Sequence, residues 1–285
     1  MKIVEDFKDY KLLDMNDGMK LEDWNGIKLY RPDPQIIWKK DIDLSNVDAI
    51  YNRSNKGGGS WDIKKKVPDR WQVKYHEMTF NIKLMGFKHT GLFPEQAYNW
   101  NIIQDIIKSS NRKLKVLNLF AYTGGASVAA LSAGAEVVHV DSSRGMVDWA
   151  KENVESSGLK DKTIRFLVDD CIKFVKREIR RGNKYDIIIM DPPSFGRGSN
   201  GEVWTLENNL YDLVTICTEL LSDNPVMFLI NGYTTGISKT ILEDVLNITV
   251  NKKYKGIISS DEIGIKCENG LLLPCGIYAR WENKQ

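Results

Sequence analysis

The spacing of hydrophobic residues changes near residue 95 of the chain. Before that point, short runs in which apolar and polar residues alternate, such as residues 26–30 and 35–38, are separated by Gly, Pro and Asp. This alternation predicts antiparallel strands that bury one face. After that point, apolar runs of strand length alternate with segments of helical periodicity, which is typical of a parallel sheet with crossover helices. We therefore expect an α/β fold with a small β-rich region at its N-terminal side.

The second part of the chain can be divided into individual elements. Strands are predicted at residues 115–120, 136–140, 164–168, 185–190, 225–231, 256–260 and 271–281. Helices are predicted near residues 95–109, 125–133, 143–157, 171–181, 206–222 and 237–247. Pro94 suits the start of the first helix, because a proline has no N–H group that would need a partner there. These elements predict a β-rich domain at residues 1–85 and an α/β domain at residues 86–285.

Composition narrows the class of protein. The 285 residues are 42% hydrophobic and 27% charged, which is enough to bury a core. The apolar runs are far shorter than the roughly 20 residues that span a bilayer, and the first ten residues lack the apolar middle of a signal peptide. The four cysteines are widely spaced and match no metal site or disulfide framework. We expect a cytoplasmic protein that has no membrane partner.

Charge is unevenly distributed, although the whole chain carries only +2. Residues 51–90 hold nine Lys or Arg and three Asp or Glu, a net +6, and Trp61, Trp71 and Tyr75 lie among these cations. Cations that bind phosphates and aromatic rings that stack on unpaired bases suit RNA. A hairpin with solvated lysines and buried tryptophans explains the same pattern. The sequence leaves both interpretations open.

A cofactor site is predicted where the first buried strand ends. The strand runs into Ala121-Tyr122-Thr123-Gly124-Gly125 and a helix follows at once. Glycine permits a tight turn and lets a ligand approach the backbone. The next strand ends at Asp141, where a carboxylate can accept both hydroxyls of a ribose. The structural alternatives are an ordinary turn glycine at Gly124 and a helix N-cap at Asp141.

The spacing of the glycines bears on the kind of cofactor. Gly124-Gly125-Ala126-Ser127-Val128 does not match the G-x-G-x-x-G pattern that seats the pyrophosphate of a dinucleotide. A cofactor without phosphates needs no such cradle, which favours S-adenosyl-L-methionine. Asp170 follows the third strand and can accept from an adenine amino group or act as a helix N-cap. A dehydrogenase is disfavoured by the same spacing.

The sharpest motif follows the fourth strand, at Asp191-Pro192-Pro193-Ser194-Phe195. Two consecutive prolines fix the backbone at the carboxyl end of a buried strand, beside the crevice where ligands bind in open α/β sheets. Such a loop can hold a planar base against a methyl donor. A simple strand-ending turn is the alternative. The glycine-rich segment 196–202 that follows is predicted to be either a lid that orders on substrate or a plain connection.

Several motifs together resemble a known family. NLFAYTGG (118–125), VDSS (140–143), DDC (169–171) and DPPSFGRG (191–198) resemble class I S-adenosylmethionine-dependent RNA methyltransferases, and FKHTGLFPEQ (87–96) resembles the segment that leads into their cofactor site. Within that family, the sequence most resembles the group of large-subunit rRNA cytosine-C5 and guanine-N7 methyltransferases. The resemblance covers about residues 85–282. It implies a Rossmann-like fold with a mostly parallel seven-stranded sheet, S-adenosyl-L-methionine as cofactor, and RNA, in particular rRNA, as partner.

The resemblance also implies roles for individual residues. The cofactor would be bound by Phe93, Gln96, Asn118, Phe120, Ala121, Tyr122, Thr123, Gly124, Asp141, Ser142, Ser143, Asp170, Cys171 and Asp191. Asp191 would also be the catalytic residue, in the loop where substrate and methyl group meet. The substrate would be bound by Pro192, Pro193, Ser194, Phe195 and Arg197.

Two departures from the family pattern affect the expected chemistry. The first 85 residues show no recognisable PUA domain, which that group commonly carries. Cytosine-C5 methylation needs a cysteine thiolate, but neither the fourth-strand loop nor the residues after the fifth strand contain cysteine. Cys171, Cys217 and Cys275 are predicted to be buried residues that pack in the core and have no chemical role. We therefore expect direct transfer to a base nitrogen. A protein or small-molecule acceptor, and an RNA-binding module without turnover, remain as alternatives.

Overall fold

The structure is a computed structural model that describes residues 1–54, 57–197, 202–234 and 236–284. The chain divides into two compact units. The first unit comprises Met1, Asn99–Ile263 and Cys275–Gln285, and the second comprises Lys2–Tyr98 and Gly264–Pro274. Each unit is described here by itself.

A large twisted sheet forms the centre of the first unit. Its strands run in the order β16-β17-β15-β12-β9-β10-β11, and β15, β12, β9, β10 and β11 are mutually parallel, whereas β17 is antiparallel to β15. The bounds are β9 (Lys115–Leu119), β10 (Glu136–Asp141), β11 (Ile164–Val168), β12 (Ile187–Met190), β15 (Met227–Gly232), β16 (Gly256–Lys266) and β17 (Leu272–Asn283). These seven strands confirm the mostly parallel, Rossmann-like sheet that the sequence predicts.

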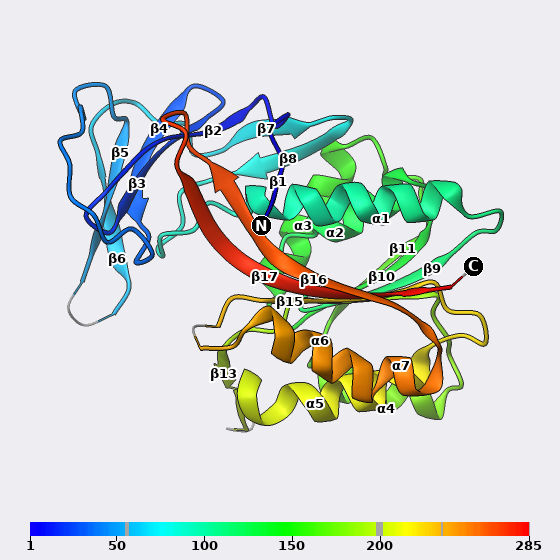
Figure 1. The fold of residues 1–285 in the computed structure, drawn as a ribbon. Coiled ribbons are helices and arrows are strands. Elements are labelled where there is room, and N and C mark those ends of the chain that lie inside the picture. Colours follow the sequence, from blue (N-terminus) through cyan, green and yellow to red (C-terminus); the bar gives the residue numbers. More distant parts are fainter. Residues whose placement is uncertain (55–56, 198–201, 235, 285) are drawn as a thin grey trace. The chain divides into compact units, whose positions relative to one another are not determined.

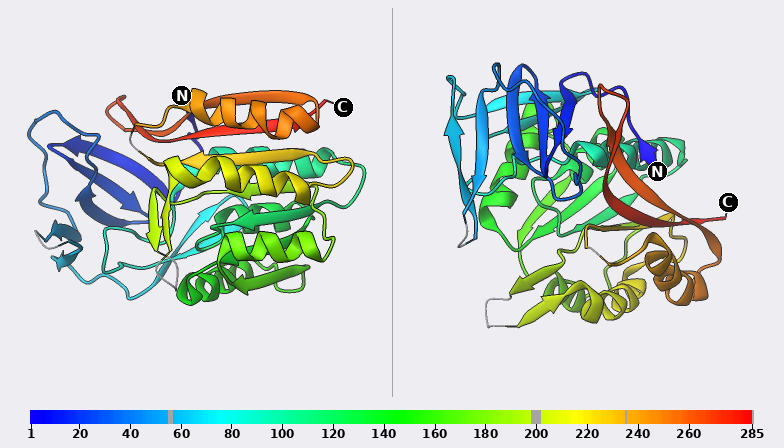
Figure 2. Two further views of the ribbon diagram at one scale, coloured as in Figure 1. Left: turned by 90° about the horizontal axis from the view of Figure 1, so that it is seen from below. Right: turned by 60° about the vertical axis from the view of Figure 1, so that its left-hand side comes forward.

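Helices cover both faces of this sheet (Figure 1). On one face lie α1 (Ala97–Ser109), α2 (Gly125–Ser132) and α3 (Arg144–Ser156). On the other lie α4 (Cys171–Arg180), α5 (Leu206–Cys217), α6 (Lys239–Ile248) and α7 (Val250–Lys253), and Figure 2 shows α5 and α6 side by side. Short 3-10 turns, Pro94–Gln96 and Thr218–Leu220, precede α1 and follow α5. Among the described residues, no helix is both long enough and apolar enough to cross a membrane.

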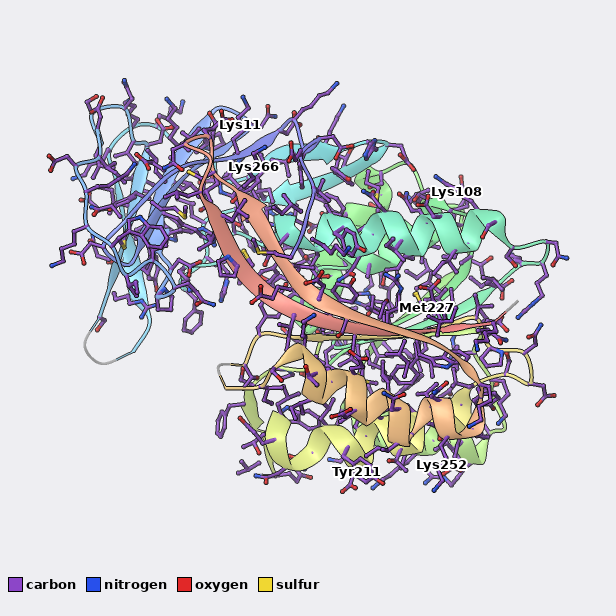
Figure 3. The ribbon with its side chains drawn as sticks, in the orientation of Figure 1. Lys11, Lys108, Tyr211, Met227, Lys252 and Lys266 are labelled. Carbon is purple, nitrogen blue, oxygen red and sulfur yellow. The ribbon has the colours of Figure 1, made fainter. Side chains whose placement is uncertain are left out.

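The core follows from this layering. Every residue of β12 and β15 is buried, because helices cover the central strands on both faces. Met227 therefore lies inside the sheet, whereas Tyr211 on α5 and Lys252 on α7 point away from it (Figure 3). Leu117, Phe228 and Leu246 belong to one core cluster, so the strands that carry the site rest on a packed base.

The second unit contains short strands. β2 (Tyr10–Asn16), β3 (Met19–Trp24), β4 (Ile27–Pro32), β5 (Ala49–Arg53) and β6 (Gly59–Ile63) form a sheet in that order, β7 (Trp71–Tyr75) and β8 (Met78–Ile82) form a hairpin, and β1 spans Lys2–Ile3. All these pairings are antiparallel except β4 with β5. The β-rich character expected of this region is confirmed.

One predicted strand in this unit, at residues 35–38, is wrong. The segment is a loop in which the carbonyls of Ile36 and Trp38 accept the N–H groups of Gly18 and Asp17 at the β2–β3 turn. Ile37 is 85% exposed, so the apolar run does not bury a continuous face. The prediction failed because Ile36 and Trp38 are shielded by local packing in a loop, which apolar residues allow without a strand partner.

Candidate cofactor and substrate site

The predicted site residues of the first unit lie in loops at one edge of the sheet. β9 pairs in parallel with β10 on one side and with β12 on the other, so their carboxyl ends are neighbours. The chain proceeds from β9 to β10 and β11, and then crosses to β12 on the opposite side of β9. This reversal of strand order is where open α/β sheets bind ligands. The loops at residues 120–124, 141–143, 169–171 and 191–195 meet there.

Phe93 and Gln96 belong to the second unit. Both lie at the 3-10 turn Pro94–Gln96 that precedes α1, where Phe93 is the N-cap residue. Their predicted contribution to the cofactor site therefore stays a prediction.

Asp141 connects two of the loops. Its Oδ2 accepts the N–H of Tyr122 at 2.9 Å, and its Oδ1 accepts the N–H of Ser143 at 2.8 Å. Ser143 is the N-cap residue of α3, so Asp141 supports the helix start without being the cap itself. An ionised carboxylate has about four lone-pair sites. Two hydrogen bonds from the backbone leave acceptor capacity for the hydroxyls of a ribose.

The turn after β9 has an unusual backbone. Phe120 (φ +54°), Tyr122 (φ +50°) and Gly124 (φ +86°) all lie in the left-handed region, which costs an L residue about 1–2 kcal/mol. The N–H of Phe120 donates to Sγ of Cys171 at 3.3 Å. A Cβ added at Gly124 would stand 3.0 Å from Cβ of Ala150. Gly124 is thus required by both backbone conformation and space. Strained turns of this kind are concentrated at functional sites.

A buried polar network supports the turn from below. Asn118 donates from Nδ2 to Oγ of Ser127 at 2.9 Å, and that Oγ lies 3.0 Å from Nδ1 of His139. Nδ2 of Asn153 donates to the carbonyl of Thr123 at 2.8 Å. All five residues are buried, so His139 is part of the core. Burial lowers the pKa of His139 to about 3, so the ring is neutral.

Ser127 and Asn153 were not predicted from the sequence. Each is a polar residue at a position of its helix that faces inward, among apolar neighbours. That mismatch between residue type and helical face is the signal that would have identified them.

The chemistry of the strand ends suits S-adenosylmethionine. Three carboxylates, Asp141, Asp170 and Asp191, lie at or just after the carboxyl ends of β10, β11 and β12, and no Lys or Arg occurs between Val116 and Ser143. A phosphate at the turn after β9 would meet this negative charge. A ligand that carries hydroxyls, amino groups and a positive sulfonium instead meets acceptors of the right charge.

The residues after β11 serve a structural role as well. Oδ1 of Asp170 accepts the N–H of Lys173 at 2.8 Å and so caps α4. The helix N-cap that the sequence predicts at Asp170 is thereby confirmed. Cys171 and Cys217 are free and buried, and burial is the main cause that raises the pKa of both thiols well above the usual range. Neither thiol is therefore a thiolate at neutral pH. Cys275 is half-buried in β17, so the expectation of a buried residue holds only in part.

The loop after β12 leads into a small hairpin. The N–H of Asp191 donates to the carbonyl of Leu119 at 3.4 Å, next to the cofactor turn. Pro193 and Ser194 are exposed, and Oγ of Ser194 accepts from the Thr234 hydroxyl at 2.7 Å. Phe195, which is 56% exposed, begins β13. The loop thus presents its backbone and an aromatic ring to solvent beside the predicted methyl donor.

β13 (Phe195–Arg197) pairs with β14 (Val203–Thr205). Three-residue strands are too short for alternation to reveal them in the sequence, and the segment was expected to be a loop. Residues 198–201 of the predicted lid and the side chain of Arg197 lie outside the described residues.

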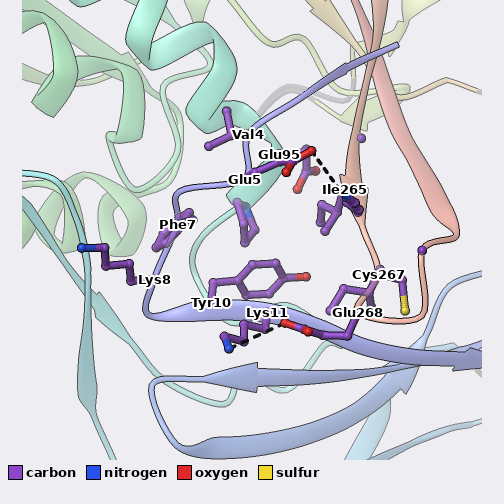
Figure 4. A pocket seen from close by; sticks show the side chains of 15 residues that line it. Val4, Glu5, Phe7, Lys8, Tyr10, Lys11, Glu95, Ile265, Cys267 and Glu268 are labelled. Carbon is purple, nitrogen blue, oxygen red and sulfur yellow. Dashed lines mark hydrogen bonds and ion pairs between the residues drawn. The ribbon is translucent and has the colours of Figure 1, made fainter.

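A separate cavity of about 540 Å³ lies in the second unit (Figure 4). Nζ of Lys266 pairs with Glu5 at 3.1 Å and Nζ of Lys11 pairs with Glu268 at 3.6 Å at its walls. Tyr10 faces into the cavity from β2. Its lining carries both signs of charge and shares no residue with the strand-end loops.

Comparison with known proteins agrees with this geometry. Residues 55–244 match the family of S-adenosylmethionine-dependent methyltransferases. A crystal structure of such a methyltransferase from Agrobacterium tumefaciens is 35% identical, covers 99% of this chain and 93% of its own, and superposes with a TM-score of 0.93.

Curated relatives include the ribosomal RNA large subunit methyltransferase K/L of Colwellia psychrerythraea, 30% identical over 69% of this chain, and that of Shewanella frigidimarina, 34% identical over 54%. The matched part is 27% and 21% of those proteins, so the chain spans about a quarter of their length. The full-length match in structure and the family match over most of the chain lead to one conclusion. The chain belongs to the S-adenosylmethionine-dependent methyltransferase family.

Proposed function

We propose that this methyltransferase acts on a base in RNA, in particular rRNA, by direct transfer to a nitrogen and without a cysteine nucleophile. The observation that carries the proposal is the position of the Asp191-Pro192-Pro193 loop, whose first N–H is bonded to Leu119 immediately before the cofactor turn. A planar acceptor held by that loop lies beside the predicted donor. The names of the curated rRNA methyltransferases support the same class of acceptor.

Bound S-adenosylmethionine supplies an electrophilic methyl group on a sulfonium. Asp141 would accept the ribose hydroxyls, Asp170 would accept from the adenine amino group, and the turn at Phe120–Gly124 would hold the remainder of the cofactor. Ser142 and Ser143 are exposed at the start of α3, where they would contact the cofactor beside its ribose. The residues so assigned hold the donor in place and contribute no covalent step.

The acceptor base is oriented by the second loop. The ring of Phe195 offers an exposed face for stacking on an unpaired base. The two prolines keep the loop rigid, and Asp191 accepts a hydrogen bond or a proton from the base. Because the cysteines of the site are protonated, these residues accelerate transfer by alignment, which supplies much of the rate in such reactions.

Basic residues on α4 support RNA as the partner. On α4, Lys173, Lys176 and Arg180 are exposed and begin beside the site. In the second unit, the indole N–H groups of Trp61 and Trp71 donate to the carbonyls of Met85 and Trp24, so these rings are partly committed to their own unit. We assign RNA contact to residues 1–85, methyl transfer to residues 86–285, and a cytoplasmic location to the protein.

The test is transfer of a labelled methyl group to total RNA. Label is expected in RNA and lost after ribonuclease treatment, whereas incorporation that survives ribonuclease identifies a protein or small-molecule acceptor. Asp191→Asn is expected to lower the rate by about 10²-fold or more, because it removes a positioned proton acceptor. Asp212→Asn, an exposed acid on α5, is the matched control and keeps the rate. RNA binding without any transfer would contradict the proposal.

A further inference from the structure

Trp204 touches both loops of the site. Its ring centroid lies 5.6 Å from that of Phe120 in the cofactor turn, with the planes inclined by 44°. Its Nε1–H donates to the carbonyl of Pro193 in the substrate loop at 2.6 Å. One side chain thus spans the two segments whose separation decides how close acceptor and donor come.

The pairing of the hairpin explains why Trp204 faces inward. Gly196 lies opposite Trp204, while Phe195 pairs with Thr205. Because successive residues of a strand point to opposite faces, Trp204 faces the turn while its neighbour Val203 faces outward, and Val203 and Phe195 are each 56% exposed. The hairpin therefore has one face that anchors the loop and one face that is open to a substrate.

Two further contacts hold the substrate loop beyond Pro193, in addition to the bond from the Asp191 N–H to Leu119 at its start. The N–H of Leu206 donates to the carbonyl of Ser194 at 3.1 Å, and Thr234 bonds the hydroxyl of the same serine. Leu206 is fully buried as the first residue of α5, so this end of the loop is firmly anchored. The hydrogen bond from Trp204 joins the second proline to a side chain that packs on the cofactor turn.

We propose that Trp204 is a positioning residue for methyl transfer, which sets the distance between the double-proline loop and the donor. The inference rests on the proposed function and adds a residue that no motif marks. Trp204 acts through Pro193 and Phe120 and has no chemical role of its own. A misplacement of about 1 Å between reacting groups can cost about 10²-fold in rate.

The test compares Trp204→Phe, which keeps an aromatic ring but loses the N–H donor, with Trp204→Ala, which loses both contacts. With saturating cofactor and RNA, kcat is expected to fall about 10-fold for Trp204→Phe and about 100-fold for Trp204→Ala. The Kd of the cofactor, measured by calorimetry, stays within about 2-fold for Trp204→Phe, because the donor site itself is intact. Trp38→Phe, in the second unit, is the control. A kcat of Trp204→Phe equal to that of the unaltered protein would overturn the inference.

A second measurement separates this inference from the proposed function. Addition of S-adenosylhomocysteine is expected to change the tryptophan emission of the unaltered protein and of Trp38→Phe more than that of Trp204→Phe, in which Trp100 still lies against Gly125 of the cofactor turn. If the unaltered protein methylates no RNA while this pattern holds, the RNA proposal fails and the coupling by Trp204 stands. If the emission change in Trp204→Phe is as large as in the unaltered protein, Trp204 does not sense the cofactor turn and the inference fails, whatever the acceptor is.

Discussion

The carboxylate of Asp141 and the backbone N–H of Tyr122 are joined by a hydrogen bond of 2.9 Å between the ends of β10 and β9. With the second bond, to Ser143, this carboxylate holds the turn after β9 against the start of α3. The same group is assigned to the ribose. A change at Asp141 therefore affects the shape of the site as well as its contacts with the ligand.

Replacement of Asp141 by Asn is expected to weaken cofactor binding. The amide keeps one acceptor oxygen, so one of the two backbone bonds is lost together with the charge. Hydrogen bonds to charged groups contribute about 1.5–3 kcal/mol, which corresponds to a Kd about 10- to 150-fold higher. Calorimetry with S-adenosylmethionine measures this. Asp148→Asn, which removes an exposed acid that pairs with Lys151 on α3, should leave the Kd unchanged. Equal affinity in both variants would contradict the assignment.

The glycine of the cofactor turn provides a test with an internal control. Gly124 and Gly134 both have positive φ, but a Cβ at Gly134 would meet nothing within 4 Å. Gly134→Ala should be destabilised only by backbone strain, which lowers the free energy of unfolding by about 1–2 kcal/mol. Gly124→Ala should lose more than Gly134→Ala, because its Cβ also presses on Ala150, and should bind cofactor more weakly. Denaturant unfolding compares the two variants. If they are equally stable, the close contact is unimportant.

His139 should make stability depend on pH. In the folded protein burial lowers its pKa to about 3, whereas in the unfolded chain it is about 6.5. Between these values the unfolded state binds one proton that the folded state does not, so stability falls as pH decreases, by at most about 1.4 kcal/mol per pH unit. Above pH 6.5 this group contributes no slope.

The measurement is the free energy of unfolding at several pH values for the unaltered protein and for His139→Asn. The variant is expected to lose stability less steeply between pH 6.5 and pH 4, even though it is less stable at neutral pH. All other titrating groups are shared and cancel in the comparison. Parallel curves for the two proteins would show that His139 is accessible to protons in the folded state.

Direct transfer predicts that no buried thiol is essential. Cys171→Ala should retain methyl transfer within about 10-fold of the unaltered rate. Any loss would arise because the N–H of Phe120 no longer has its acceptor, Sγ of Cys171. Loss of a covalent nucleophile, by contrast, costs on the order of 10³-fold or more. Cys217→Ala, equally buried in α5, is the matched comparison. Single-turnover assays of both variants decide the matter, and complete inactivity of either would indicate a covalent intermediate.

The strand ends could be predicted from the sequence because each combines an apolar run with a polar residue where the run stops. That pattern correctly placed Gly124 and Asp170 at the edge of the sheet. Contacts between distant segments carry no such periodic signal. The ring of Trp204 meets that of Phe120 only after β12 has crossed to the other side of β9. For the same reason, the return of residues 264–274 to the second unit was not foreseen.

The order of strands has a consequence for synthesis of the protein. β17, which follows the other strands of this sheet in the sequence, lies between β16 and β15. Until it has left the ribosome, the edge of β15 has no neighbour on that side, and an unpaired buried strand is prone to associate with other chains. A nascent polypeptide can thus assemble the parallel strands early, but its sheet closes only when β17 has been made.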